Sequence, residues 1–402
     1  MTPSIRFSGF TENYKSYALH TFMSRIMRKN TKLETDIPLT ISSQDGLVDQ
    51  RTYFGKTIAS SDMSGYYLLK NREFTYNKST SKGFPFGSIK RLNKYPLGAV
   101  STLYICFALK AEAFDSDYIE HYFDSQKWNK EVSMICAEGA RNHGLLNVPI
   151  DDFFDTLHHL PPSIHEQQKI AAFLSAYDEK VALQKGCVEA LEERKKGLLQ
   201  KIFSQEIRFK ANDGSEYPEW EECQLKKVLY EYKEKCEKDG SYEHVSLTKE
   251  GVVPKTERYD RDFLVTNENK EYRVTHYDDI CYNPANLKFG VICRNKYGDA
   301  IFSPIYVTFK VNKDFLPKFV EMLVTRKDFI NYSLKYQEGT VYERMAVSPE
   351  DLLSITVKIP KIEEQKKIAD FFTAIDAQIS FAKEKLETLQ EIKKGLLQQM
   401  FC

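Results

Sequence analysis

The sequence has 402 residues, enough for two or three domains with well-developed cores. Hydrophobic residues make up 42% and charged residues 28% of the chain, a balance that excludes a disordered or fibrous protein. The 57 basic residues cancel the 57 acidic residues, which excludes a uniformly basic protein but leaves room for a local basic face.

The chain begins without the basic and apolar regions of a secretory signal. Its longest apolar stretch, Gly98 to Leu109, is too short to span a bilayer, and we expect it to be a buried strand. Eight cysteines without a Cys-x-x-Cys pair predict neither a zinc site nor a disulfide framework. The simplest interpretation is reduced thiols in a cytoplasmic protein that has no membrane partner.

In chain order, residues 104–109 predict a buried strand and residues 114–128 an amphipathic helix. A long helical pattern follows from Pro162. The second half gives the same series, with a strand at 305–310, a helix at 315–329 and a second long helix after Pro360. A proline just ahead of each long helix suits a helix start, where its missing N–H is not needed.

The two long helices are an internal repeat. Residues 162–203 and 360–401 align at a constant offset of 198 and share 21 identities in 42 positions. Both copies contain Pro-x-Ile-x-Glu-Gln-x-Lys-Ile-Ala and close on Lys-Lys-Gly-Leu-Leu-Gln. The repeat extends weakly into the longer segments, where Ile5-Arg6-Phe7 matches Ile207-Arg208-Phe209 and Tyr76-Asn77 matches Tyr282-Asn283. These longer segments therefore predict one fold present twice with different loops.

Each repeated helix carries apolar residues in alternating steps of three and four, the pattern of a coiled coil. We expect the two seams to pack against each other through Ile170, Leu174, Val181, Val188, Leu191, Leu198, Ile368, Phe372, Ile375, Ile379, Leu386, Leu389 and Leu396. The alternative is that each helix packs only on its own domain. Gly197 and Gly395 either permit a close approach of the partner backbone or mark fraying helix ends.

Two variable segments, each followed by a helix that opens with this motif, resemble the specificity subunits of type I restriction–modification systems. The similarity covers essentially the whole chain, and the Glu166-Gln167 and Glu364-Gln365 pairs are its specific part. The stretch with Arg208, Phe209 and Trp220 is also similar to the family pattern. In the first half, Tyr14 replaces the tryptophan, a departure from that pattern.

The resemblance implies an α+β fold with pseudo-twofold symmetry: target recognition domains at 1–160 and 206–358, and antiparallel coiled-coil helices at 161–205 and 359–402. It implies that each domain reads one half of a split site in double-stranded DNA, while the helices set the spacing and dock two modification (methyltransferase) subunits. Restriction subunits join that core. The chain itself then has no catalytic residue, metal or cofactor; S-adenosylmethionine belongs to the methyltransferase, and ATP and Mg to the restriction subunit.

Polar loops supply the candidate DNA contacts, because Arg and Lys read guanine or bind phosphate and Asn reads adenine. Each of these residues has the alternative of being an ordinary exposed polar group. In the first domain the candidates are Asn77, Lys78, Lys82, Lys90, Arg91, Lys94, Arg141 and Asn142. In the second domain they are Asn283, Asn286, Lys288, Arg294, Asn295, Thr340 and Arg344.

Two rival functions stay open. An assembly scaffold would use the coiled coil alone, although the Asn-, Lys- and Arg-rich loops argue against it. A fused methyltransferase would bind S-adenosylmethionine, but the sequence has no glycine-rich cofactor loop. Asn283-Pro-Ala-Asn286 lacks the second proline and the aromatic of an adenine methyltransferase loop, and we interpret it as a turn. His158, His159 and His165 have no carboxylate or thiol at ligand spacing, which favours plain surface residues over a metal site.

Overall fold

A computed structural model describes residues 2–43, 45–55, 60, 62–110, 112, 114–136, 144–236, 241–255, 271–338 and 345–402. Within this part of the chain, no helix has both the length and the apolar character needed to cross a membrane. The chain divides into two compact units. Unit 1 comprises Met1–Val188 and Ala382–Cys402, and unit 2 comprises Glu189–Phe381.

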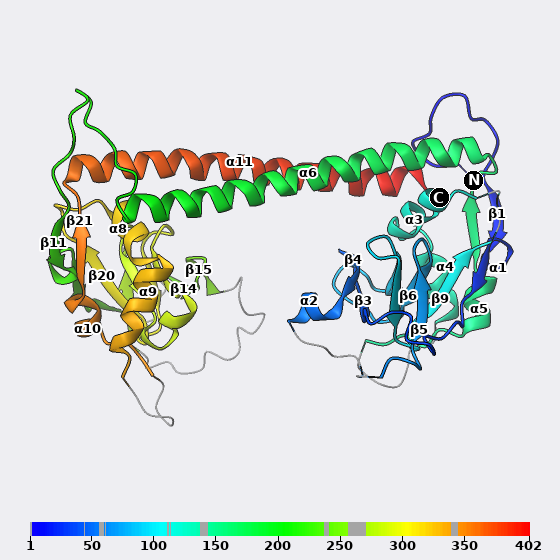
Figure 1. The fold of residues 1–402 in the computed structure, drawn as a ribbon, viewed down its shortest axis with the longest axis horizontal. Coiled ribbons are helices and arrows are strands. Elements are labelled where there is room, and N and C mark those ends of the chain that lie inside the picture. Colours follow the sequence, from blue (N-terminus) through cyan, green and yellow to red (C-terminus); the bar gives the residue numbers. More distant parts are fainter. Residues whose placement is uncertain are drawn as a thin grey trace. The chain divides into compact units, whose positions relative to one another are not determined.

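Unit 1 is a mixture of short strands and helices, labelled in Figure 1. Its elements outside the long helices are β1 (Lys15–Ala18), α1 (Leu19–Phe22), β2 (Met23–Arg25), β3 (Leu39–Ser42), β4 (Gly46–Asp49), α2 (Gln50–Phe54), β5 (Tyr67–Lys70), β6 (Phe74–Asn77), β7 (Ser88–Arg91), β8 (Leu97–Val100), β9 (Ile105–Leu109), α3 (Ser116–Asp124), α4 (Asn129–Ile135), α5 (Ile150–Asp155) and β10 (Leu157–Leu160).

Unit 2 has a closely similar series. Its elements outside the long helices are β11 (Glu221–Gln224), η1 (Leu225–Lys227), β12 (Leu229–Tyr232), β13 (Lys235–Cys236), β14 (Glu243–Leu247), β15 (Val252–Pro254), β16 (Tyr272–Thr275), β17 (Ile280–Tyr282), η3 (Pro284–Phe289), β18 (Ile292–Arg294), β19 (Ala300–Phe302), β20 (Val307–Val311), α8 (Pro317–Val324), α9 (Lys327–Ser333), η4 (Leu334–Tyr336), α10 (Pro349–Ser354) and β21 (Thr356–Ile359).

The central sheet is the same in both units. It has four antiparallel strands, in the order β2-β9-β6-β7 in unit 1 and β12-β20-β17-β18 in unit 2. Tyr76 of β6 pairs with Ile89, and Tyr282 of β17 pairs with Ile292, so the two sheets also share their register. The units differ elsewhere: unit 1 adds the pairs β3-β4 and β5-β8, and unit 2 adds the five-stranded order β13-β16-β19-β14-β15.

Two long helices, α6 (Ile164–Phe203) and α11 (Ile362–Met400), each contribute to both units. In unit 1 they lie antiparallel, because Asp178 forms an ion pair with Lys393 and Gln184 Nε2 donates to the carbonyl of Ala382 at 2.9 Å. In unit 2, Lys195 and Asp376 form the equivalent ion pair at 2.5 Å. We predicted the helices as segments separate from the domains, whereas each compact unit includes part of both helices. The reason is that the two helices pair in antiparallel orientation.

The predicted seam residues lie in or beside the unit cores. Ile170 and Leu174 share the core of unit 1 with Leu397 and Met400 of α11 and with Phe401, which follows the helix. In unit 2, Leu191 and Leu198 pack against the core that contains Ile368, Phe372, Ile375 and Ile379. Val188 and Leu389 are buried, and Val181, Leu386 and Leu396 are half-buried. The seams thus pack on a domain and on the other helix at once.

The glycines near the helix ends do not mark a tight approach. A Cβ added to Gly197 would meet nothing within 4 Å, and one added to Gly395 would meet only the end of Gln399 at 3.8 Å.

A buried glutamate locks the start of each long helix to a segment far away in sequence. Glu166 is 1% exposed and accepts two hydrogen bonds from Arg6, at 2.6 and 2.8 Å, and a longer one from the hydroxyl of Tyr14 at 3.4 Å. The tyrosine that departs from the family pattern therefore keeps a donor aimed at the carboxylate. A guanidinium in this two-pronged geometry is the strongest neutral-pH partner for a buried carboxylate.

The same arrangement holds unit 2. Glu364 is 1% exposed and accepts from Arg208 Nε at 3.3 Å and from its terminal nitrogen at 2.9 Å. Trp220 Nε1 donates to the same carboxylate at 3.2 Å. Side-chain hydrogen bonding to the glutamate raises the pKa of Arg6 and of Arg208. Arg208 and Trp220, two residues of the family pattern, therefore both donate hydrogen bonds to the Glu364 carboxylate.

The glutamine that follows each glutamate fixes a second segment. Gln167 Nε2 donates to the carbonyl of Pro161 at 2.9 Å, and its Oε1 accepts from the backbone N–H of Asp115 at 2.8 Å, just ahead of α3. Gln365 makes the same pair of bonds to Pro360 and Leu316, both at 2.9 Å. Both the oxygen and the nitrogen of each buried amide are therefore hydrogen-bonded, as buried polar groups generally are. We call each Glu-Gln pair with its partners a latch.

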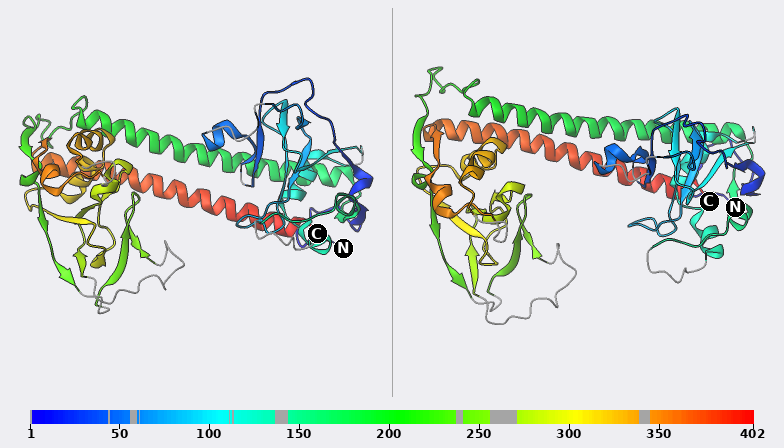
Figure 2. Two further views of the ribbon diagram at one scale, coloured as in Figure 1. Left: turned by 90° about the horizontal axis from the view of Figure 1, so that it is seen from below. Right: turned by 60° about the horizontal axis from the view of Figure 1, so that its bottom comes forward.

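An equivalent backbone hydrogen bond holds the segment around Ile5 in unit 1 and the segment around Ile207 in unit 2. In unit 1 the N–H of Ile5 donates to the carbonyl of Gln399 at 2.9 Å, and in unit 2 the N–H of Ile207 donates to Lys201 at 3.2 Å. Lys201 and Gln399 are equivalent in the repeat. Both views of Figure 2 place the two termini beside the end of α11. The segment that carries Ile5 is therefore held to α11 in the same way as the segment that carries Ile207 is held to α6.

Two predicted elements are interrupted. The apolar stretch 98–109 is not one strand: it forms the end of β8 and all of β9, which belong to different sheets. A turn at 101–104, closed by the N–H of Tyr104 on the carbonyl of Ser101, separates them. The helix expected at 315–329 divides into α8 and α9 at Thr325, whose hydroxyl bonds back to the carbonyl of Glu321 at 2.7 Å.

His158 is a core residue, so its prediction as a surface residue was wrong. It is 2% exposed and lies between the hydroxyls of Tyr122 and Thr156, each 2.9 Å from a ring nitrogen. Burial, and then the charge of His159, lower the pKa of His158 to about 3. Burial also lowers the pKa of His121 in the same unit. In the sequence, His158 and His159 stand side by side between Leu157 and Leu160. Nothing in this pattern indicates that the His158 ring is the buried one.

The latch yields a prediction about stability. Replacement of Glu364 by alanine removes the carboxylate from the half-buried Arg208 guanidinium and from the buried N–H of Trp220, and we expect unit 2 to lose about 2 kcal/mol of unfolding free energy. Urea unfolding followed by tryptophan fluorescence measures the loss, since Trp220 lies in the latch. The matched control is Glu363→Ala, one residue earlier and exposed. Equal effects of the two substitutions would contradict a stabilising role for the latch.

His158 yields a prediction about pH. An unfolded histidine titrates near 6.5, whereas the folded one stays neutral to about pH 3, so the unfolded chain binds the extra proton. Stability is therefore complete above pH 6.5 and falls as the pH drops towards 3, by up to about 1.4 kcal/mol per pH unit from this group. In urea titrations between pH 7.5 and 4.5, His158→Gln should flatten the decline relative to wild type. An unchanged slope would show that His158 is not the source.

Candidate nucleic-acid interface

The predicted contact residues lie on equivalent hairpins of the two central sheets. Tyr76 at the end of β6 donates its hydroxyl to the carbonyl of Phe86 at 2.7 Å, and Tyr282 at the end of β17 donates to Val347 at 3.1 Å. Each ring is also stacked on a core phenylalanine, Phe153 in unit 1 and Phe309 in unit 2. The loops that follow these tyrosines are therefore held in the same place on a rigid support.

In unit 2 these loops border a cleft of about 640 Å³. Its walls are the β14–β15 hairpin, the η3 turn and the turn at 303–306. The Asn286 side chain lines the cleft and has no hydrogen bond to another residue in the described part of the chain. Lys249 and the exposed ring of Phe289 stand at its edge, and the ammonium of Lys288 lies 5.0 Å from that ring. An amide, cations and an exposed aromatic together suit contact with nucleotides.

The corresponding place in unit 1 holds a smaller cavity, of about 150 Å³. Lys78 and Arg25 line it together with Leu145 and the turn at 101–104. Asn77 is half-buried, and its side-chain oxygen accepts from the N–H of Ser79 at 3.0 Å, which shapes the start of the loop. Lys82 and Lys94 are exposed. Unit 1 thus offers the cations of the predicted set, while Asn77 is partly occupied in forming the turn.

Two apolar residues at these clefts escaped the sequence-based list. Leu103 is 65% exposed and Ile305 is 58% exposed, each at the third position of the turn that closes by a 3.1 Å bond from the following tyrosine. The matching Ser-Thr-Leu-Tyr and Ser-Pro-Ile-Tyr sequences were a usable signal, but we assigned them to buried strands. An aliphatic side chain held out in solvent in both units has no role in either core.

Arg91 and Arg294, both predicted as DNA contacts, are engaged in ion pairs within their own units. They occupy equivalent positions on β7 and β18. Arg91 is 8% exposed and pairs with Glu120 at 2.5 Å and with Asp117 at 2.7 Å. Arg294 pairs with Glu321 at 3.1 Å, at the position equivalent to Glu120. The same arginine pairs with the same glutamate in both units, Arg91 with Glu120 and Arg294 with Glu321. This is expected of a residue that stabilises the shared fold.

Three further candidates are also engaged within the fold. Lys90 is half-buried and pairs with Asp124 at 2.7 Å. Asn295 is fully buried, and its amide bonds to Thr275, the carbonyl of Gly298 and the N–H of Tyr297. Asn283 is buried and caps the η3 turn through the N–H of Ala285 at 3.1 Å. Polar loops provide such turn-forming residues as often as binding residues, and sequence alone does not separate them.

The remaining candidates cannot be placed in this way. Arg141, Asn142, Thr340 and Arg344 lie outside the described residues. Among the residues that are described, no group of three or more His, Cys, Asp or Glu side chains is arranged to hold a metal ion.

Comparisons with known proteins agree with the repeat and the fold. A family model for the type I restriction modification DNA specificity domain matches residues 220–391. The putative type I restriction enzyme MjaX specificity subunit of Methanocaldococcus jannaschii is 29% identical over 266 residues, which is 59% of this chain and 56% of that protein. The MjaVIII specificity subunit of the same organism is 26% identical, over 59% of each chain. The match thus spans less than two thirds of either curated relative.

Two solved structures share the fold. One, from a study of complex assembly and conformational transition of the type I R-M system, aligns with a TM-score of 0.58 at 13% identity, over 97% of this chain and 98% of that chain. The S subunit of a type I restriction–modification system from M. genitalium aligns with a TM-score of 0.53 at 14% identity, over 100% and 99%. The expected resemblance is confirmed as a similarity: residues 220–391 match the model of the type I restriction modification DNA specificity domain, and the chain is similar to two curated specificity subunits.

Proposed function

We propose that this chain is the DNA-recognition subunit of a type I restriction–modification complex, and that each unit reads one half of a split, asymmetric site. The observation that carries the proposal is the match of residues 220–391 to the DNA specificity domain, together with the same central sheet and latch in unit 1. A second copy of a DNA-reading fold in one chain implies a second half-site.

The long helices set the spacing in this proposal. DNA is a regular rod, so two readers address two groove segments only when their separation and rotation are fixed. Paired helices of 40 and 39 residues that enter both cores meet that need, whereas a flexible linker does not. The same helices dock two modification subunits, to which restriction subunits are added, in the cytoplasm.

The chemistry belongs to the partners. We propose that this chain neither methylates nor cuts DNA and carries no cofactor of its own. S-adenosylmethionine acts in the modification subunit, and ATP and Mg act in the restriction subunit. What the chain supplies is the choice of site: amide and cationic side chains in the clefts read base edges and phosphates.

The proposal is tested by selecting duplexes from a random library with the chain bound to its modification subunit. We expect a site of two short defined blocks around an undefined gap. Replacement of residues 1–160 by those of a relative should change one block and leave the other. Salt-dependent binding without any sequence preference would favour the scaffold function, and binding of S-adenosylmethionine by the chain alone would favour the fused enzyme.

Two residues of the unit 2 cleft have separable effects. Asn286→Ala should lower affinity for the selected site by about 1–3 kcal/mol and relax preference at one base pair, since a base contact is lost. Lys249→Ala should weaken binding to every sequence and reduce the dependence of log K on log salt by about 1. Fluorescence anisotropy at several salt concentrations measures both. Lys313→Ala, an exposed lysine outside the cleft, is the control, and an Asn286→Ala complex with unaltered preference would remove Asn286 from the interface.

A further inference from the structure

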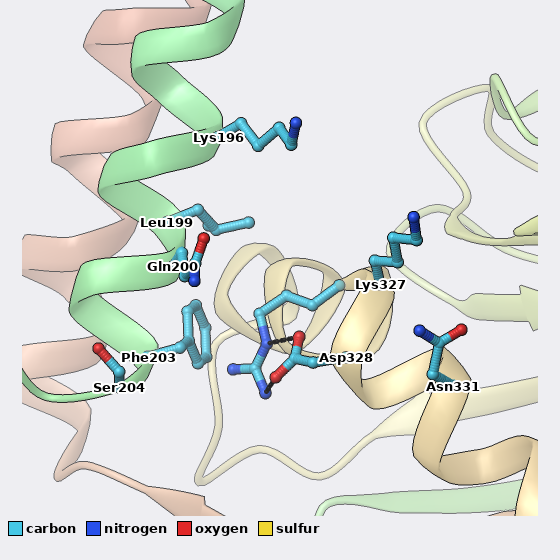
Figure 3. Close-up of a pocket in the computed structure, with 9 residues that line it drawn as sticks. Lys196, Leu199, Gln200, Phe203, Ser204, Lys327, Asp328 and Asn331 are labelled. Carbon is cyan, nitrogen blue, oxygen red and sulfur yellow. Dashed lines mark hydrogen bonds and ion pairs between the residues drawn. The ribbon is translucent and has the colours of Figure 1, made fainter.

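A second cleft lies within unit 2, between the last turns of α6 and the helix α9, as Figure 3 shows. Its volume is about 490 Å³. Apolar side chains, two lysines and two amides line it. The residues concerned are Lys196, Leu199, Gln200 and Phe203 on α6, and Lys327 and Asn331 on α9.

The charge in this cleft is unbalanced. Arg326 lies with its guanidinium 4.1 Å from the ring centre of Phe203 and binds Asp328 at 3.0 and 3.1 Å. That pair neutralises the one carboxylate of the lining. Lys196 and Lys327 remain at the rim, and the pair of Lys196 with Glu193 is long, at 3.4 Å, and exposed on both sides. A pair of this kind contributes little, so the rim attracts anions.

The cleft continues past the Arg326–Phe203 stack into a second hollow of about 410 Å³. The two hollows share Phe203, Arg326 and Asp328. The second is lined by further large apolar side chains, among them Trp220, Leu323 and Tyr332. The surface is therefore an elongated apolar groove with a cationic rim, rather than a site for a small ion.

At the equivalent place in unit 1, the end of the last long helix packs against α3. Phe401, the counterpart of Phe203, is 2% exposed and packs against Tyr118 and Tyr122. Gln398, the counterpart of Gln200, donates to the carbonyl of Ser125 at 2.8 Å and closes the end of the helix onto α3. The same fold thus has this phenylalanine buried in unit 1 and lining a cleft in unit 2. The cleft is therefore not required by the fold.

We propose that the groove between α6 and α9 binds an acidic amphipathic segment of one modification subunit. The proposal rests on the function proposed above. Carboxylates of the segment complement Lys196 and Lys327, and its apolar side chains cover Leu199 and Phe203. A DNA backbone would satisfy the lysines but would leave the apolar floor in water, so charge and apolar area together favour a polypeptide.

The test reverses the charge of the rim. The variant Lys196→Glu/Lys327→Glu changes two exposed residues, so its melting temperature should equal that of wild type. The control Lys226→Glu/Lys313→Glu makes the same change on two exposed residues of unit 2 that lie off the long helices and line neither hollow. Each chain is co-expressed with the modification subunit, and the stoichiometry and dissociation of the complex are measured by native mass spectrometry and by dilution.

Wild type and the control should retain two modification subunits. The groove variant should retain one at the same concentration, with the affinity for the second lowered by roughly tenfold or more, because like charges now meet. Two subunits held equally well by the variant would overturn the proposal. So would an unchanged stoichiometry with weaker, less salt-dependent DNA binding, which would assign the groove to DNA. A wild-type chain that binds no modification subunit would instead contradict the proposed function.

Discussion

Each unit depends on one buried carboxylate at the start of its long helix. Glu166 and Glu364 draw in an arginine from an arm that lies about 160 residues earlier in the sequence, and the next glutamine fixes the segment that precedes a domain helix. A buried carboxylate costs several kcal/mol unless it is paired and fully hydrogen-bonded, so the contact is all-or-none. It gives each long helix one orientation on its own domain, which is the property a spacer between two DNA readers needs.

The repeat separates residues that serve the fold from those that differ between the halves. Positions kept with their partners in both units include the latch, the ion pair between the long helices, and the arginine that pins the edge strand to the helix beside it. Positions that differ include the lining of the two clefts, Lys78 in one and Asn286 in the other. Comparison of equivalent positions in the two units therefore separates residues that maintain the fold from residues that vary between the units.

Sequence reasoning reached the features that depend on periodicity and identity. The two long helices and a fold present twice followed from the repeat, whereas the Glu-Gln pairs were noted only as the specific part of the family resemblance. Sequence alone does not tell a polar side chain that binds a partner from one that forms a turn or fills a core site. Asn295 and Arg91 satisfy their own loops and neighbours, and His158 fills a core site between two hydroxyls. The exposure of Leu103 and Ile305 was missed for a different reason, because aliphatic residues beside a strand are expected to be buried.

The central claim is that two latched units read two separate segments of one duplex. Hydroxyl-radical footprinting of the chain with its modification subunit, on a duplex that contains the selected site, tests it most directly. Two protected blocks separated by a stretch whose sequence can be changed without loss of binding are the predicted result. A single protected block, or protection that does not depend on the sequence, would contradict it.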